Sequence, residues 1–293
     1  MRNNHLLMLA AAAAFVGASG AQANGTDRAE SKTATPPAAV AVQPAPVAAA
    51  PAPAAPALQA ARAVLSGVGV ESAVEKTQVQ TALETLGKSV RRQSDPSALR
   101  MAFQAYYNYK TANPGKVKKP YLYYVDYGLS NTTPRGYVFD MDKLTVVDGP
   151  FTVAHGRGSA SPSDNKPVRF SNRQGSNATS LGLYLAQETY GFSGTASGRR
   201  YTSVGLRLQG LSGRYNSAAR ARGVVAHGAP YVTASRAGRS EGCPAMEQGR
   251  ARQLLPKISR GGLVFLFSPL DKTWMRSDPW ASRSTGVTGR SNG

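Results

Sequence analysis

The chain contains a single cysteine, Cys243, and two of its three histidines, His155 and His227, lie beyond the first 23 residues. Cys243 follows His227 by sixteen residues. A thiolate is a strong nucleophile and an imidazole can remove the thiol proton, so the pair predicts covalent catalysis by a cysteine with a histidine base. A small buried structural cysteine is the alternative, which the surrounding sequence disfavours.

The first 23 residues indicate export. Arg2 precedes an apolar run over 6–16, and Ala21-Gln22-Ala23 matches a signal-peptide cleavage site. The run is too short to span a bilayer, so we expect a signal peptide over 1–23, no transmembrane segment after cleavage, and a location in the periplasm or cell wall. Structural cysteines of exported proteins usually form disulfides, so a lone Cys243 favours a chemical role.

The net charge of +19 becomes +18 when Arg2 leaves with the signal peptide, and so basic a chain attracts polyanions. Nucleic acid would be the first expectation in the cytoplasm, but export disfavours it. We therefore expect peptidoglycan stem-peptide carboxylates and anionic envelope polymers as partners, with a basic surface that serves only solubility as the alternative. We expect no cofactor, and no metal, because the two histidines lie too far apart to suggest a zinc site.

The sequence divides into five expected segments. They are a signal peptide (1–23), a Pro/Ala-rich linker (24–58), a helical segment (59–117), a β-rich domain (118–275) and a disordered tail (276–293). Apolar residues at helical spacing indicate core-facing helices in the third segment, at Val79, Leu83, Leu86 and Val90 and again at Leu99, Phe103 and Tyr106.

Short β-rich runs separated by turn residues fill the fourth segment. We expect strands over 121–126, 136–139, 144–147, 181–185 and 204–208, and a central strand over 262–267. The fold class is therefore α+β, predominantly β.

A helix is expected directly after the cysteine. Pro244 suits a first helical position, and good helix formers follow it as far as Leu254. Cys243 would then lie at a helix N-terminus, where free N–H groups and the helix dipole favour a thiolate. The same N–H groups, with flexible Gly242, could hold an oxyanion.

Several motifs in the same order resemble the bacterial L,D-transpeptidases, the YkuD-like enzymes, and most closely the branch of murein L,D-transpeptidase catalytic domain proteins. Val225-Ala226-His227-Gly228 followed by Ser240-Glu241-Gly242-Cys243 is similar to the signature of that family. Motifs around His155-Gly156, Ser171-Asn172 and Leu206-Arg207-Leu208 extend the resemblance over about residues 120–270.

The resemblance implies a β-sandwich catalytic domain with a short helical N-terminal preface, acting on peptidoglycan. It implies Cys243 as nucleophile, His227 as general base, and Ser240 and Gly242 with the Cys243 backbone as the oxyanion region. In this family the thiolate attacks the third stem residue and expels the terminal D-alanine. The thioester then passes to an amine of a second stem, forming a 3-3 cross-link. Water as acceptor would give an L,D-carboxypeptidase instead, and a non-enzymatic cell-wall-binding module is a further alternative.

Other residues are candidates for substrate contacts, namely His155, Arg239, Arg207, Ser171 and Asn172. His155 shares the tetrapeptide Val-Ala-His-Gly with His227, which fits either a second site histidine or a structural one. Arg207 and Arg222 could each clamp a carboxylate, although a surface role is favoured.

Glu241 stands where much of the family has a histidine. Its carboxylate would oppose thiolate formation if it faced Cys243, and we favour an outward-facing side chain.

Overall fold

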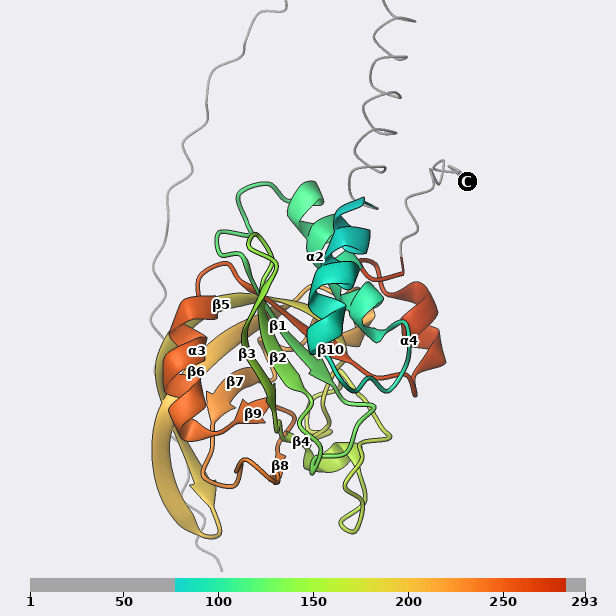
Figure 1. Ribbon diagram of the computed structural model, residues 1–293. Coiled ribbons are helices and arrows are strands. Elements are labelled where there is room, and N and C mark those ends of the chain that lie inside the picture. Colours follow the sequence, from blue (N-terminus) through green and yellow to red (C-terminus); the bar gives the residue numbers. More distant parts are fainter. Residues whose placement is uncertain (1–76, 283–293) are drawn as a thin grey trace, which may run out of the picture. The chain divides into compact units, whose positions relative to one another are not determined.

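The computed structural model describes residues 77–282 (Figure 1). The predicted signal peptide (1–23) and linker (24–58) lie outside the described residues, as do 59–76 and 283–293. The elements in chain order are a helix over 77–86, η1 (Gly87–Ser89), α2 (Ala98–Ala112), β1 (Tyr121–Asp126), β2 (Gly136–Asp140), β3 (Thr145–Phe151), β4 (His155–Gly156), η2 (Arg157–Ser159), β5 (Gly182–Ala196), β6 (Arg199–Gly210), η3 (Gly213–Tyr215), β7 (Val225–Gly228), β8 (Arg239–Ser240), β9 (Ala245–Met246), α3 (Gln248–Ile258), β10 (Leu263–Phe267) and α4 (Lys272–Ser277).

One large sheet organises the domain. Its strand order is β3-β2-β1-β10-β5-β6-β7-β9, and β4 pairs with β8 in a separate two-stranded sheet. The β1/β10, β7/β9 and β4/β8 pairs are parallel, and the other neighbours are antiparallel. This mostly β architecture with few helices confirms the predicted α+β, predominantly β fold class.

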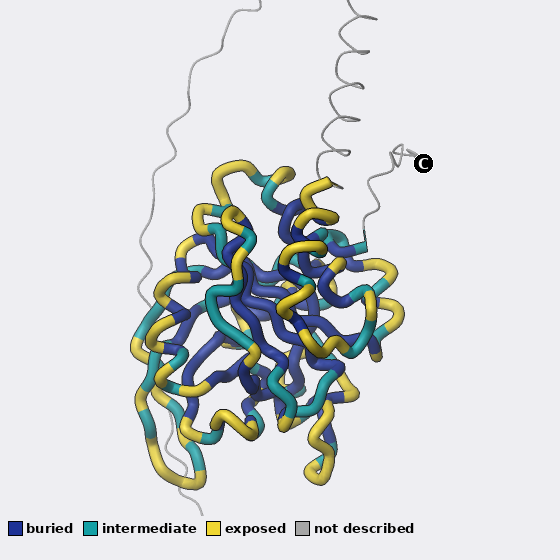
Figure 2. Tube along the Cα trace, in the orientation of Figure 1, coloured by how far each residue is buried: buried dark blue, intermediate teal, exposed yellow. Residues whose placement is uncertain are grey.

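The two faces of the sheet are buried under different helices. Along β1, Leu122 and Tyr124 belong to a core shared with α2 and the helix over 77–86, whereas Tyr123 and Val125 belong to a core shared with α3. The central strands of the sheet are accordingly buried, while exposed residues lie in the loops, on the helices and along the outer part of the β5–β6 hairpin (Figure 2). Both sides of a strand in this position face apolar neighbours, which explains why β10 is apolar at every residue. The predicted central strand is confirmed, since β10 is the fourth of the eight strands.

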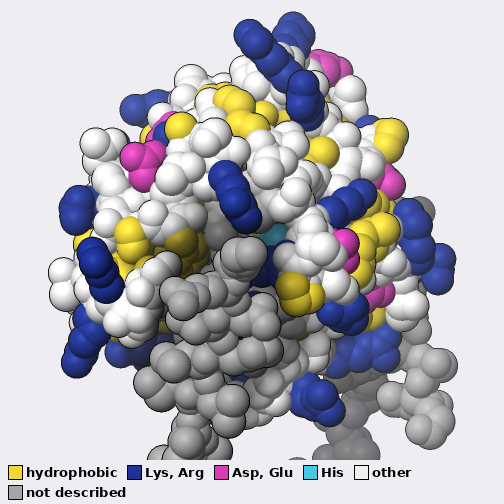
Figure 3. Space-filling view, turned by 90° about the horizontal axis from the view of Figure 1, so that it is seen from below, with side chains coloured by type: hydrophobic (Ala, Val, Ile, Leu, Met, Phe, Trp, Pro, Cys, Tyr) yellow, Lys and Arg dark blue, Asp and Glu magenta, His cyan; other side chains and the backbone are white. Residues whose placement is uncertain are grey.

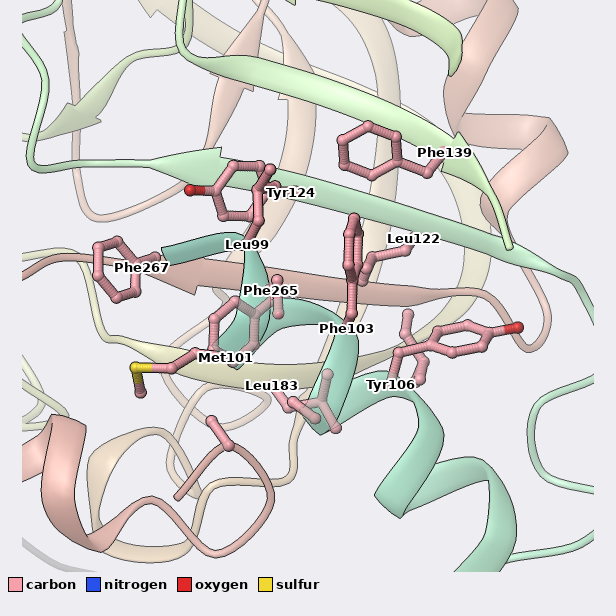
Figure 4. Close-up of a cluster of buried hydrophobic side chains, with 14 of the residues drawn as sticks. Leu99, Met101, Phe103, Tyr106, Leu122, Tyr124, Phe139, Leu183, Phe265 and Phe267 are labelled. Carbon is pink, nitrogen blue, oxygen red and sulfur yellow. The ribbon is translucent and has the colours of Figure 1, made fainter. Parts of the chain in front are cut away.

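Aromatic side chains fill the core on the α2 side. Phe103 of α2 meets Phe139 of β2 edge to face, with ring centroids 5.5 Å apart (Figure 4). Trp274 of α4 packs on Phe265 and Phe267 of β10. Each large apolar side chain buried in this way contributes about 1.5–3 kcal/mol to folding. The predicted helical segment therefore forms one wall of the same core as the sheet.

The β5–β6 hairpin is longer than its sequence pattern indicated. The predicted strands over 181–185 and 204–208 fall almost wholly inside β5 and β6, but the pairing continues to Ala196 and Arg199. Ser197 and Gly198 close the hairpin with φ of 50° and 75°, the left-handed conformations that a tight two-residue hairpin turn requires. The outer half of this hairpin is only partly buried and forms one wall of the cleft described below.

The domain extends past the boundary predicted from sequence. Residues 276–282, which the sequence places in a disordered tail, pack against the rest of the domain. Asp278 and Ala281 are buried, and the Trp280 indole N–H donates to the Leu211 carbonyl at 2.8 Å. The tail prediction is therefore wrong over this stretch. Two tryptophans near the chain end, Trp274 and Trp280, pack against the domain, although charged and polar residues surround them in the sequence.

Candidate active site

Cys243 lies in the loop between β8 and β9. The predicted helix directly after it is wrong, because Ala245 and Met246 form β9, and α3 begins only at Gln248. Parallel pairing with His227 and Gly228 of β7 overrides the helix propensity of this stretch. The thiol consequently gains nothing from a helix N-terminus, and its environment is set by the β7 strand beside it.

The β7–β9 pairing brings the cysteine and His227 to one cleft. His227 lies opposite Ala245 in the ladder, and two residues earlier the Val225 N–H points at the Cys243 Sγ, with 3.5 Å between nitrogen and sulfur. Both side chains line a cleft of about 680 Å³, together with the outer part of the β5–β6 hairpin. A histidine is visible in a hollow of the surface in Figure 3.

His227 is held in one orientation. Its Nδ1 lies 3.1 Å from the Gly228 carbonyl oxygen, which can only accept, so Nδ1 carries the proton and Nε2 has a free lone pair. The Phe192 ring of the hairpin stacks on the imidazole, with centroids 4.2 Å apart and an interplanar angle of 20°. Burial lowers the His227 pKa to about 4, although the Gly228 hydrogen bond opposes this. At neutral pH the imidazole is therefore an uncharged base.

The thiol is also uncharged at rest. Burial raises the pKa of Cys243 to about 11, against the lowering effects of the Val225 N–H and the Arg222 charge, and Glu241 adds a smaller raising effect. Because the thiol pKa lies above neutrality and the imidazole pKa below it, the two groups do not form a thiolate–imidazolium pair before substrate binds. The arrangement suits proton removal from the thiol during its attack on an electrophile.

Ser240 and Gly242 shape the turn that carries the cysteine. The Ser240 hydroxyl donates to the Cys243 carbonyl at 2.7 Å and accepts the Gly242 N–H at 3.2 Å. Gly242 has a φ of 119°, and a Cβ at this position would lie 2.8 Å from the Ala178 carbonyl oxygen. Within residues 77–282 the Cys243 N–H donates to no acceptor.

His155 belongs to β4, does not line the cleft and lies in a buried polar cluster. It is fully buried, and its Nδ1 accepts from Arg135 Nη2 at 3.0 Å. Burial and the Arg135 charge lower its pKa to about 3. Arg135 also donates to the Val153 and Leu129 carbonyls and stacks over the Tyr127 ring. The sequence analysis missed Arg135, since nothing in the pattern distinguishes it from the many surface arginines.

The remaining candidates occupy different places. Arg239 lines the cleft and donates to the carbonyls of Pro162 and Asp164. Arg207 does not line it, and instead pairs with Glu188 and stacks on Tyr190. The Ser171 carbonyl and the Asn172 side chain support loops near the cleft without lining it, through contacts to Arg222 and to 214–218 respectively.

Arg222 lines the cleft, whereas its sequence context favoured a surface role. Its guanidinium donates to the carbonyls of Ser171 and Ala178 and to the hydroxyls of Ser176 and Ser180. These acceptors are all uncharged, so its positive charge acts on the thiol without a carboxylate to neutralise it.

Glu241 forms an ion pair with Arg157 at 3.0 Å, and the two side chains are 72% and 61% exposed. Both residues line the cleft. Within the described residues no group of three or more histidine, cysteine or acidic side chains could hold a metal ion. In the same part of the chain no helix has the length and apolar character to cross a membrane.

The chain belongs to the L,D-transpeptidase catalytic domain family, because the model of that family matches residues 90–267. This confirms the resemblance found in the sequence. The mostly β fold is consistent with the β-sandwich of this family.

The chain is similar to several solved structures at low identity. An L,D-transpeptidase from Mycobacterium smegmatis is 17% identical, with 50% of this chain and 58% of that chain covered and a TM-score of 0.33. An L,D-transpeptidase from Stackebrandtia nassauensis is 14% identical, with 66% and 78% covered and a TM-score of 0.32. The match thus spans little more than half the length of the mycobacterial enzyme. No curated protein matches the chain.

Proposed function

We propose that this protein is a cysteine-dependent peptidoglycan L,D-transpeptidase in which Cys243 is the nucleophile and His227 the general base. The observation that carries the proposal is the shared cleft. Cys243 and the buried His227 line it together, and the imidazole is anchored through Nδ1 so that only Nε2 can accept a proton.

The proposed reaction begins with an uncharged thiol and an uncharged imidazole. His227 Nε2 takes the thiol proton while Cys243 Sγ attacks the carbonyl carbon of the third stem residue. The C–S bond forms, the bond to the terminal D-alanine breaks, and His227 returns the proton to the departing amine. A second stem's amine then attacks the thioester, loses a proton to His227, and releases the thiolate, which recovers that proton. The product is a 3-3 cross-link.

The Cys243 N–H is the group proposed to stabilise the tetrahedral oxyanion. The Gly242 N–H is occupied by the Ser240 hydroxyl, so these two residues contribute by fixing the turn. In acyl-transfer enzymes, loss of one oxyanion-hole donor costs on the order of a hundredfold in rate. The hydrogen bonds of the Ser240 hydroxyl hold the Cys243 amide in place.

We further propose that the chain is exported to the periplasm or cell wall. The proposal is supported by the leader sequence over 1–23, and by the strongly basic composition, which suits stem-peptide carboxylates and other anionic envelope polymers.

The test is incubation of the mature protein with purified disaccharide tetrapeptide, followed by mass spectrometry. A cross-linked dimer supports the transpeptidase, a tripeptide indicates the carboxypeptidase alternative, and unchanged tetrapeptide with retained sacculus binding indicates a binding module. Cys243→Ala should stay folded and lose turnover, and a carbapenem should add mass to the wild type and not to this variant. Activity of Cys243→Ala above a few per cent of wild type would exclude the cysteine mechanism.

A further inference from the structure

An exposed ion pair stands beside the proposed nucleophile. The parallel β4–β8 ladder aligns His155 with Arg239 and Gly156 with Ser240. The next residues along the two chains are Arg157 and Glu241, whose side chains meet at 3.0 Å. Glu241 is two residues from Cys243, so the backbone register fixes this pair at the wall of the cleft next to the thiol.

The charges of the cleft differ in how firmly they are held. Three arginines and one carboxylate line it, which leaves a formal excess of two positive charges. Arg222 and Arg239 are fixed by carbonyl and hydroxyl acceptors of the surrounding loops. Among the described residues, Arg157 and Glu241 have only each other as polar side-chain partners.

An exposed pair of this kind is readily opened. Solvent-exposed ion pairs contribute about 0–1 kcal/mol to stability, and these side chains are 61% and 72% exposed. A ligand that offers both an ammonium and a carboxylate can replace the internal pair with two ion pairs of its own. An α-amino-acid group carries the two charges on one carbon, and so can reach two adjacent opposite charges at once.

We propose that Arg157 and Glu241 form a subsite for the zwitterionic α-amino-acid end of a peptidoglycan diamino acid, with Arg157 binding its carboxylate and Glu241 its ammonium. This inference rests on the proposed function. The subsite selects a diamino acid whose side chain ends in an amino acid over one, such as lysine, whose side chain ends in an amine alone. The same group is present on the donor stem and on the acceptor stem, and the experiment separates these sources.

If the bound group is the acceptor, the chemistry must convert its ammonium to an amine. The ammonium loses one proton to solvent, and the neutral nitrogen attacks the thioester carbonyl carbon. The C–N bond forms as the C–S bond breaks, and His227 passes the second nitrogen proton to the leaving thiolate of Cys243. Glu241 would therefore act in recruitment and orientation of the acceptor and not as the base.

A binding measurement tests the subsite independently of turnover. Calorimetric titration of the Cys243→Ala protein with tetrapeptides that carry meso-diaminopimelate or lysine in the third position, where peptide bonds occupy the α-amino and α-carboxyl groups of that residue, should give tighter binding of the former. Arg157→Gln and Glu241→Gln should each reduce that preference on the order of tenfold, which is the loss of one charge-assisted hydrogen bond. Glu188→Gln is the matched control, because Glu188 pairs with arginines outside the cleft.

Two kinetic arms then locate the ligand. In the donor arm, acylation of Cys243 is compared for tetrapeptides with meso-diaminopimelate or lysine in the third position. In the acceptor arm, the acyl-enzyme is resolved with D-alanine or with ethylamine, which lacks the carboxylate. The arm in which both Gln variants erase the preference identifies the bound stem.

The double variant Arg157→Glu with Glu241→Arg separates binding from a merely structural ion pair. It keeps the pair and the net charge but reverses the sites for ammonium and carboxylate, so it should keep the stability of the wild type and not recover the preference.

Equal binding of the diaminopimelate and lysine tetrapeptides, or a preference unaltered in every variant, would overturn the subsite even if turnover is intact. Absence of acylation in the wild type with intact binding preference would instead overturn the proposed function.

Discussion

Alkylation of Cys243 should require unusually high pH. Burial raises its pKa to about 11, whereas an ordinary cysteine has a pKa of about 8.5. Since only the thiolate reacts with iodoacetamide, the reactive fraction at pH 7.5 should be on the order of a hundredfold smaller than in an unfolded chain. The unfolded protein in denaturant is the internal reference, and the rate is followed by the mass added to the intact chain.

Arg222 supplies the perturbation that tests the cause. Its positive charge lowers the thiol pKa, so Arg222→Gln should move the alkylation profile to still higher pH, while Arg222→Lys, which retains the charge, should stay closer to wild type. Glu241 has the smallest effect among the causes, so Glu241→Gln should shift the profile only slightly toward lower pH. A wild-type midpoint at or below pH 8.5 would refute the burial argument, and a large downward shift in Glu241→Gln would show that the carboxylate controls the thiol.

Substitutions at four further residues test the site. His227→Ala should reduce the rate of Cys243 acylation about a hundredfold to ten-thousandfold. His155→Ala should mainly destabilise the fold, by about 1–3 kcal/mol, because it leaves a buried guanidinium short of an acceptor. If His155→Ala lost as much acylation at unchanged stability, the assignment of the base would be contradicted. Phe192→Ala uncovers the His227 ring, so the His227 pKa should rise from about 4 toward its ordinary 6.5 and the acid limb of the pH–rate profile should move up with it, an effect that Phe192→Leu should largely avoid. Gly242→Ala places a Cβ on a residue with φ of 119° and within 2.8 Å of the Ala178 carbonyl oxygen. It should lower the free energy of unfolding by about 1–3 kcal/mol, measured by thermal unfolding, and slow acylation. Gly249→Ala, where nothing lies within 4 Å of the added Cβ, should do neither.

The sheet could be predicted from sequence because its strands carry their own signals. β1 runs from Tyr121 to Asp126, as the run of β-formers indicated. β10 is apolar at every residue, as expected for a central strand with both faces covered by helices. The length of the β5–β6 hairpin was not predictable in the same way. Its outer half is polar and glycine-containing, and it is stabilised by cross-strand pairing that the local pattern does not reveal.

The surroundings of the cysteine could not be predicted because they depend on tertiary pairing. Ala245 and Met246 favour a helix locally, yet they complete a ladder with His227 and Gly228 that also seats Cys243 beside Val225. The roles of individual arginines were equally inaccessible. Composition gives their excess charge, but only the three-dimensional arrangement distinguishes Arg222, which lines the cleft, from the exposed majority.

The two histidines illustrate how the same local sequence acquires different chemistry. Val153 to Gly156 and Val225 to Gly228 share the tetrapeptide Val-Ala-His-Gly, but the partners of the two rings impose opposite tautomers. Arg135 can only donate, so His155 accepts at Nδ1 and its neutral ring carries the proton on Nε2, an atom with no partner among the described residues.

The Gly228 carbonyl can only accept, so His227 donates from Nδ1 and keeps Nε2 free to take a proton. His155 could accept at its buried Nε2 only after changing tautomer and giving up the hydrogen bond from a buried arginine. His227 needs neither change, and it already lines the cleft with the thiol. Hydrogen-bond polarity therefore favours His227 as the base, on grounds that neither the spacing of the histidines nor the resemblance in sequence could supply.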